Sequence, residues 1–249
     1  RRRQRQMCIR DSARSFLAAR ILLDKINANM IISGAFGLFE KKTVIAVGGY
    51  DNSTMGEDME LVVRLHEFSR MNRKPYKIDF AQDAICWSQT PEKLSELGKQ
   101  RKRWQRGLFQ CMWGHRKMLA NPRYGAVGLL SYLYFLLYEL LSPFIELLGV
   151  LTMVLSVMMD MLNVKFMLVF LAYYALYGIL LTLTAYFSRI YTIDQRFSFR
   201  ELILAITACF FETTFLRFYL EFVRVTAFVG YKKNKLNWDK LERKKMNRI

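Results

Sequence analysis

A long apolar stretch near the middle of the chain restricts the possible folds more than any other feature of the sequence. Residues 127–159 form 33 consecutive positions without lysine or arginine. A helix needs about 20 apolar residues to cross a bilayer. The stretch is therefore too long for one straight span and too short for two spans with a loop. Polar residues at Glu139, Ser142-Pro143 and Glu146 interrupt it, which predicts an interfacial helix followed by a span.

The apolar part of the chain, residues 121–230, is predicted to be a membrane region. Its expected segments are an interfacial helix over 127–141, spans over 143–162 and 166–187, and a last apolar segment over 202–229. That last segment carries four charged residues, which favours an interfacial or packed helix, with a third span as the alternative. Glu139 and Glu146 would be costly against lipid, so we expect them to face protein or a water-filled path.

The two ends of the chain are polar. Residues 1–11 are rich in arginine and lack both apolar periodicity and the apolar core of a signal peptide, so we interpret them as a leader of doubtful origin. Residues 12–120 are predicted to form one polar domain, and residues 231–249 a basic tail. Basic residues on both sides of an apolar region are typical of cytoplasmic loops, and two spans place both on the same side.

The net charge of +17 comes from 38 lysines and arginines against 21 acidic residues. Because these basic residues flank the apolar region and do not form a patch on a soluble fold, nucleic-acid binding is not predicted. The four cysteines, Cys8, Cys86, Cys111 and Cys209, are far apart, and the chain has two histidines. This spacing predicts neither a disulfide framework nor a zinc site nor a histidine-based metal site.

The most informative polar segment is Lys99–Lys117, which contains seven basic residues and no acidic one. In a helix Gln100, Arg103 and Trp104 share one face, because residues three and four apart are neighbours. A guanidinium suits bidentate contact with phosphate, and an indole suits stacking on a sugar or a base. The alternative is a basic juxtamembrane helix on anionic lipid, anchored by Trp104. That alternative explains the charge but not Gln100 or the spacing.

A second candidate site lies at Glu57-Asp58. Apolar residues at helical spacing over 61–68 put Asp58 in the first turn of a helix. Thr54 and Glu57 fit a capping box, which is a structural reason for an acid at position 57. Backbone N–H groups and the helix dipole keep a carboxylate in the first turn ionised. An ionised, positioned carboxylate can act as a general base.

The rest of the polar domain is predicted to mix short strands with helices. Residues 30–39 predict a strand pair broken at Gly34 and Gly37. Residues 75–80 and 83–87 alternate like two further strands. Helices are expected over 12–26, over 41–47 before a turn at 48–51, and from a Thr90 cap with Pro91 in the first turn up to Gln100.

The order of these motifs resembles that of the processive, membrane-embedded family 2 glycosyltransferases, the group that includes cellulose, hyaluronan and poly-N-acetylglucosamine synthases. The motifs are Gly-Ala-Phe-Gly-x-Phe at 34–39, Val-Gly-Gly-Tyr-Asp at 47–51, Gly-Glu-Asp at 56–58 and Gln-x-x-Arg-Trp at 100–104. The resemblance extends from Ile31 to Gly107. Gly56 stands where the family often has threonine.

The resemblance implies the C-terminal part of an α/β, GT-A-like catalytic domain, followed by transmembrane and interfacial helices. The implied reaction is the inverting transfer of a sugar from a nucleotide-sugar, such as a UDP-sugar, to a growing polysaccharide that is exported. Mg²⁺ or Mn²⁺ would neutralise the leaving diphosphate. The implied location is the bacterial inner (plasma) membrane, with the catalytic part and the C-terminus in the cytoplasm. Membrane lipid and the glycan acceptor are the other expected partners, and export subunits are not identified.

The resemblance also assigns roles to individual residues. Asp58 would be the general base, with Glu57 beside it. Arg103 would bind the leaving diphosphate. The full set of implied substrate-binding residues is Gln100, Arg103, Trp104, Phe36 and Gly37.

Two alternatives stay open. One is a membrane anchor or scaffold whose segment Lys99–Lys117 binds anionic lipid. The other is a non-processive lipid-linked sugar transferase, although such enzymes generally lack Gln-x-x-Arg-Trp. No residue of this chain matches the nucleotide-binding and metal-binding motifs that precede Ile31 in the family, so the metal ligands are expected upstream of this sequence.

We expect this chain alone to bind a nucleotide-sugar poorly and to transfer no sugar, because the family's donor-binding half is not matched in it. The measurement is incorporation of radiolabelled sugar into polymer by the purified chain in detergent. Measurable incorporation would contradict the interpretation that this chain does not contain the donor-binding half of the enzyme.

Overall fold

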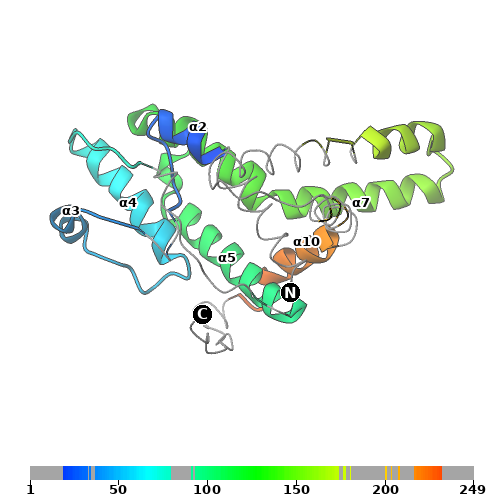
Figure 1. Ribbon diagram of the computed structural model, residues 1–249, viewed down its shortest axis with the longest axis horizontal. Coiled ribbons are helices and arrows are strands. Elements are labelled where there is room, and N and C mark those ends of the chain that lie inside the picture. The colour runs from blue at the N-terminus through cyan, green and yellow to red at the C-terminus, as the bar shows by residue number, and fades with distance from the viewer. Residues whose placement is uncertain are drawn as a thin grey trace.

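The computed structural model describes residues 19–32, 34, 37–79, 91, 93–173, 176–177, 180, 200, 203, 207 and 216–231. These residues fold into helices joined by loops, as Figure 1 shows. The longer helices are α2 (Ala19–Lys25), α3 (Lys41–Ala46), α4 (Glu57–Met71), α5 (Leu94–Gly114), α7 (Ser142–Met158) and α10 (Arg217–Val225). The short helical segments are η2 (Arg116–Met118), η3 (Pro122–Tyr124), η4 (Val127–Ser131), α6 (Tyr132–Tyr134), η5 (Phe135–Leu140) and η7 (Thr226–Phe228).

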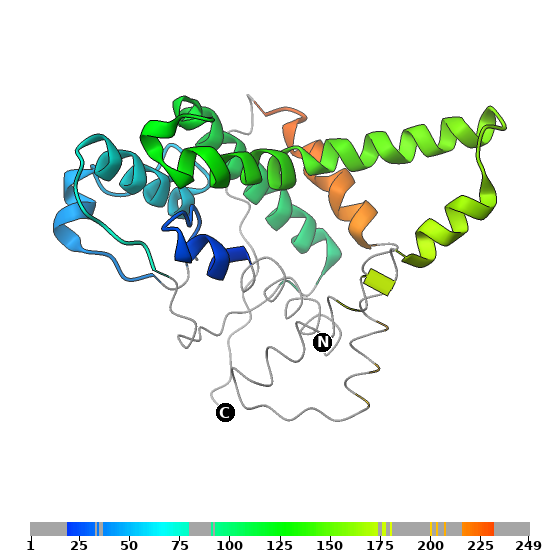
Figure 2. The ribbon, with the colours of Figure 1, turned by 90° about the horizontal axis from the view of Figure 1, so that it is seen from above.

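Helix α5 is the central element. It packs against α4 on one side and against α10 on another, and α10 also packs against α7. Figure 2 shows α7 extending away from α4 and α5, with α10 between α5 and α7. Gly98 allows the close approach of α10, because a Cβ there would lie 3.2 Å from the Tyr219 hydroxyl. Helix α5 therefore joins the polar domain to the apolar helices.

Helix α4 forms where the sequence predicts it. Its buried side chains include Met59, Leu61, Val62, Val63 and Leu65, which supply the apolar face. Acidic residues occupy its first turn and Arg70 its last turn. Charges of these signs at these two ends interact favourably with the helix dipole. The capping-box prediction is wrong. Gly56 is the N-cap, no side chain caps the helix, and the Thr54 hydroxyl is buried without a hydrogen-bond partner.

The start of α4 touches the middle of α5 through backbone atoms. A Cβ on Gly107 would lie 2.7 Å from the Gly56 nitrogen and 3.0 Å from the Met55 carbonyl carbon. The Met55 N–H also donates to Gln110 Oε1 at 2.8 Å. Glycine at positions 56 and 107 therefore sets the distance between the two helices.

A buried polar network connects α5 to the apolar helices. The Gln105 side chain is 2% exposed, and its amide donates to the Leu140 carbonyl at 3.0 Å. Its carbonyl oxygen accepts from Arg224 Nε at 2.9 Å, and Arg224 Nη1 donates to both Glu221 carboxylate oxygens at 3.1 Å. Because both ends of the Gln105 amide are satisfied, burying it carries little penalty.

The two glutamates of the apolar stretch face protein, as predicted. Glu146 forms an ion pair with Arg217, whose Nε donates to Glu146 Oε2 at 2.7 Å. Glu139 Oε2 lies 4.0 Å from Arg224 Nη2, which also donates to the Glu139 backbone carbonyl. Both carboxylates are therefore held by arginines of α10.

The apolar stretch bends close to the boundary predicted between the interfacial helix and the first span. Helical segments Val127–Leu140 and Ser142–Met158 meet at a bend of 45°. Among the residues described, no single helix has both the length and the apolar composition of a membrane span, although this bent pair satisfies both together. Helix Val164–Tyr173 is apolar but shorter. The predicted spans 143–162 and 166–187 stay predictions, and most of 181–215 lies outside the described residues.

The strand predictions are wrong for the residues that the structure describes. Segments 30–39 and 75–79 are loops in their described parts, and 80–87 lie outside them. The Asn27 side chain explains the second loop. Its amide donates to the Tyr76 carbonyl at 3.0 Å and accepts from Ile78 N–H at 2.9 Å, so a side chain takes the hydrogen bonds that a partner strand would make.

The start of one helix also differs from the prediction. Helix α5 begins at Leu94 with Lys93 as its N-cap, so Pro91 lies before the helix, and Thr90 is not described. Helix α3 begins at Lys41 and ends at Ala46, close to the predicted 41–47. The predicted turn after it is confirmed, because Gly48 and Gly49 have φ values of +90° and +74°, which glycine adopts readily.

His66 connects α4 to two loops. The fully buried imidazole lies 2.8 Å from the Asn29 carbonyl through Nε2 and 2.7 Å from the Tyr76 hydroxyl through Nδ1. Arg70 Nε donates to the same hydroxyl at 3.0 Å. Burial, reinforced by the charge of Arg70, lowers the pKa of His66 from 6.5 to about 4. The imidazole is therefore neutral near pH 7.

Replacing Gly107 with alanine is expected to destabilise the chain by about 2 kcal/mol, because the new methyl group meets backbone atoms of Met55 and Gly56 that cannot rotate away. Thermal unfolding of the detergent-solubilised chain is the measurement. Gly114→Ala is the matched control in the same helix, since a Cβ there meets nothing within 4 Å. Equal midpoints for the two variants would show that the Gly56–Gly107 contact is not tight.

Stability is expected to fall as the pH drops from 6.5 toward 4, because the unfolded His66 takes up a proton that the folded one does not. The loss attributable to His66 is on the order of 3 kcal/mol. It is measured as the difference in pH dependence of the unfolding midpoint between the wild type and His66→Gln. Tyr76 and Arg70 are unchanged in both proteins, so parallel pH curves would contradict the low pKa.

Candidate active site

Asp58 lies in the first turn of α4 and accepts two backbone hydrogen bonds. Its Oδ2 accepts from Gly34 N–H at 3.1 Å, and its Oδ1 accepts from Met59 N–H at 2.9 Å. A Cβ on Gly34 would lie 3.0 Å from Oδ2, so glycine at position 34 allows the loop to reach the carboxylate. The first glycine of the predicted Gly-Ala-Phe-Gly motif therefore helps to hold the predicted base in place.

Gln100, Arg103 and Trp104 all lie in α5, as the spacing predicts. Gln100 and Arg103 are half-buried, and Trp104 is 46% exposed. The Arg101 guanidinium lies 4.9 Å from the centre of the Trp104 ring, a distance that suits a cation–π contact. A large part of the indole surface is therefore available to a ligand.

The Gly56–Gly107 contact fixes where the start of α4 lies along α5. Gly107 lies four residues after Arg103, and so one turn further along the same face of α5. Gly56 lies two residues before Asp58. The start of α4 is therefore seated about one helical turn from Arg103, on the same face of α5.

Of the three other predicted site residues, the structure describes Glu57 and Gly37. Glu57 is half-buried in the first turn of α4, next to Asp58. Gly37 is in an exposed loop, where a Cβ would lie 2.9 Å from the Phe39 ring. Phe36 lies outside the described residues. The roles of all three in substrate binding or catalysis stay predictions.

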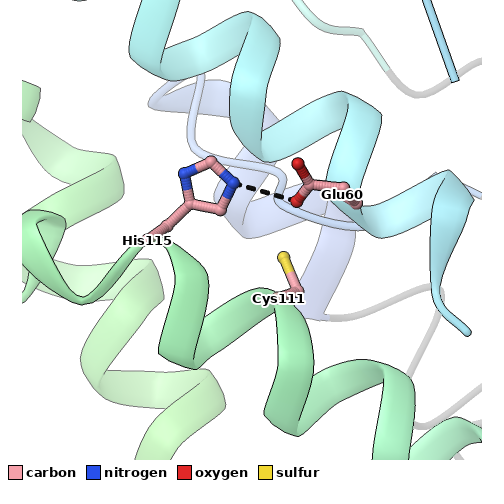
Figure 3. Close-up of side chains that lie close together, drawn as sticks. All are labelled: Glu60, Cys111 and His115. Atoms are coloured by element: carbon pink, nitrogen blue, oxygen red, sulfur yellow. Dashed lines mark hydrogen bonds and ion pairs between the residues drawn. The ribbon is translucent and has the colours of Figure 1, made fainter. Parts of the chain in front are cut away.

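A second cluster of reactive side chains lies between α4 and the end of α5 (Figure 3). His115 Nε2 lies 2.9 Å from Glu60 Oε2, and His115 Nδ1 lies 2.6 Å from Glu67 Oε2. The buried thiol of Cys111 points toward the same carboxylate and ring. The ligand atoms of Glu60, Cys111 and His115 all lie within 4.8 Å of one another.

The titratable groups of this cluster shift one another's pKa values. Burial favours the neutral forms of Glu60 and His115, but their contact opposes it. The result is a lowered pKa for Glu60, helped by Arg64, and a raised pKa for His115, helped by Glu67. Burial and the Glu60 carboxylate raise the pKa of the Cys111 thiol well above its usual range. These shifts favour a carboxylate–imidazolium pair beside a neutral thiol.

This cluster does not fit the Mg²⁺ or Mn²⁺ ion that the family resemblance implies. Those hard cations prefer oxygen ligands and keep several water molecules, whereas this site offers one carboxylate, one thiol and one imidazole in a largely buried position. The catalytic cation is still expected on ligands outside this sequence.

A basic cleft of about 760 Å³ opens at the far end of α4. Its charged lining residues are Arg70, Arg73, Lys74 and Arg123. Asp58 lies twelve residues before Arg70 along a helix that rises about 1.5 Å per residue. The cleft is therefore separate from the candidate catalytic residues.

Some positions that shape the site were missed from the sequence. Gln105, Arg106 and Gln110 bind the apolar helices or the Met55 backbone, although the sequence shows them only as part of a basic, amide-rich helix. The Glu60–Cys111–His115 cluster was also missed, because the spacing of cysteine and histidine alone predicts no site. The available signal was Cys111 and His115 at i and i+4, which places them on one helical face.

Comparison with known proteins shows the family to which the chain belongs. The profile described as "Glycosyl transferase family group 2" matches residues 6–229, which is most of the chain. The chain belongs to this family. It is 37% identical over 90 residues to the poly-beta-1,6-N-acetyl-D-glucosamine synthase of Staphylococcus aureus, and 36% identical over 90 residues to the enzyme of the same name from Staphylococcus epidermidis.

The aligned part is limited in both relatives. It covers 36% of this chain and 19% of each relative, so the chain spans about a fifth of the length of these synthases. No solved structure gives a significant match. Membership of glycosyl transferase family group 2 confirms the family predicted from the motifs, and it implies the GT-A-like fold to which the described helices would belong.

Proposed function

We propose that this chain forms the acceptor side of an inverting glycosyltransferase that extends a polysaccharide at the cytoplasmic face of a membrane. The donor is a nucleotide-sugar whose binding half lies outside this sequence. The observation that carries the proposal is the backbone contact between Gly56 and Gly107, which seats the first turn of α4 against the face of α5 that bears Arg103. Family membership supports the reaction class.

In this proposal Asp58 acts as the general base. Its carboxylate takes the proton of an acceptor hydroxyl while the hydroxyl oxygen attacks the anomeric carbon of the donor. The bond from that carbon to the nucleotide diphosphate breaks, and its electron pair leaves with the diphosphate. Attack from the side opposite the leaving group inverts the anomeric configuration. The hydrogen bond from Gly34 N–H fixes the orientation of the base.

The α5 residues supply binding and charge stabilisation. Arg103 contacts the diphosphate as its negative charge develops, since a guanidinium can make two parallel hydrogen bonds to phosphate oxygens. The exposed face of Trp104 stacks on the acceptor sugar or the nucleotide. Gln100, one turn before Trp104, lines the acceptor end. A bound Mg²⁺ or Mn²⁺ would add further charge neutralisation at the diphosphate.

The contacts of α5 with the apolar helices support the proposed location at a membrane. Gln105 and Arg106 of α5 bind backbone carbonyls of Leu140 and Ala227, so the helix that carries Arg103 is fixed directly to the apolar segments. We propose that the growing glycan leaves beside these segments. The staphylococcal relatives are named for a polymer of N-acetylglucosamine. UDP-N-acetylglucosamine is therefore the first donor to assay.

Arg103→Lys is expected to reduce polymer synthesis by the complete synthase at least about 10-fold, because a point charge does not replace a fork of two hydrogen bonds. Asp58→Asn should reduce it by about 10²-fold to 10⁴-fold, through loss of the base. Both rates are measured as labelled sugar incorporated into polymer by purified synthase.

Lys102→Arg is the matched control, since it alters a basic residue on the opposite face of the same helix and keeps its charge. The lipid-anchor alternative predicts that Arg103→Lys is harmless, and that Lys102→Gln and Arg103→Gln weaken binding to anionic vesicles equally. Undiminished polymer synthesis by the Arg103→Lys variant would favour the lipid-anchor alternative over the proposed glycosyltransferase role of this segment.

A further inference from the structure

We propose that Glu60, Cys111 and His115 form a binding site for a zinc-type divalent cation that ties α4 to the end of α5. The site is separate from the proposed transfer reaction, which assigns these residues no role. It is also distinct from the catalytic Mg²⁺ or Mn²⁺, whose ligands are oxygen atoms.

The geometry of the three side chains suits one ion. The three ligand atoms lie within 4.8 Å of one another, and the closest pair, Glu60 Oε2 and His115 Nε2, is 2.9 Å apart. Ligands of a tetrahedral zinc ion, at about 2.0 to 2.3 Å from the metal, lie about 3.3 to 3.7 Å from one another. Small side-chain rotations would therefore bring all three atoms to ligand distances.

The ligand types select the class of metal. Thiolate, imidazole and carboxylate are the usual ligands of Zn²⁺, and a thiolate with an imidazole disfavours Mg²⁺ and Ca²⁺. Cys111 lies in the last turn of α5 and His115 is the C-cap of that helix, and Glu60 comes from α4. Two helices therefore supply three ligands, which leaves a fourth position for water.

A supporting contact orients the imidazole. Glu67 Oε2 lies 2.6 Å from His115 Nδ1, so Nε2 is directed toward Glu60 and Cys111, as Figure 3 shows. A carboxylate on the second nitrogen of a metal-binding histidine is a usual feature of zinc sites. The groups also balance in charge, because a doubly charged ion and Arg64 together neutralise the thiolate and the two carboxylates.

The position of the site gives it a structural effect. Glu60 lies two residues after Asp58 in α4, and Cys111 lies one turn after Gly107 in α5. A metal ion there would hold the two helices together beside the Gly56–Gly107 contact. Loading the site would therefore raise the stability of the arrangement that positions Asp58.

Cobalt(II) titration of the purified chain in detergent tests the proposal, with Cys8, Cys86 and Cys209 replaced by serine so that Cys111 is the remaining thiol. The expected result is one equivalent of bound Co²⁺ with a thiolate charge-transfer band in the near ultraviolet, displaced by one equivalent of Zn²⁺. Cys111→Ser should abolish the band, and His115→Asn or Glu60→Gln should weaken Zn²⁺ binding at least about 10-fold. Absence of the band in the folded parent protein would overturn the proposal.

His66→Gln is the matched control, because it removes the other histidine of the chain and should leave Co²⁺ binding unchanged. Glu67→Gln keeps all three ligands and should weaken binding about 10-fold to 100-fold, which tests the site even where a ligand variant fails to fold. Zn²⁺ should raise the unfolding midpoint of the parent but not that of Cys111→Ser. Equal Zn²⁺ affinity in the parent and His115→Asn would show that the ion binds elsewhere.

Discussion

The described structure depends on the backbone contact between Gly56 and Gly107. It allows the first turn of α4 to lie against the middle of α5, at a separation that any side chain at position 107 would prevent. It places the start of α4, two residues before Asp58, one helical turn from Arg103 along α5. The Met55–Gln110 hydrogen bond and the Glu60–His115 ion pair hold the same two helices together at neighbouring positions. The candidate site is thus a property of one helix–helix contact.

The same helix α5 also carries contacts to the apolar segments. Its buried Gln105 binds both the Leu140 carbonyl and Arg224, while Arg106 binds the Ala227 carbonyl. These polar residues lie directly after Arg103-Trp104 in the sequence. A displacement of the apolar helices would therefore be transmitted to Arg103 through one continuous helix, without an intervening loop.

Sequence reasoning predicted the helical motifs well, because their signals are local. Helical spacing located Asp58 in the first turn of α4 and placed Gln100, Arg103 and Trp104 in one helix. The strands of 30–39 and 75–79 were wrong, because Asp58 and the Asn27 side chain take backbone hydrogen bonds that the alternation pattern assigns to neighbouring strands. The Glu60–Cys111–His115 cluster could not be predicted, since it depends on how two distant helices pack.

The most direct measurement is a cryo-electron microscopy structure of the complete synthase with bound UDP and a short glycan. The expected map shows the diphosphate on the Arg103 guanidinium, and the terminal glycan hydroxyl within hydrogen-bonding distance of the Asp58 carboxylate. A map with the glycan end elsewhere, and with Arg103 turned toward lipid headgroups, would contradict the assignment of this chain to the acceptor side of a glycosyltransferase.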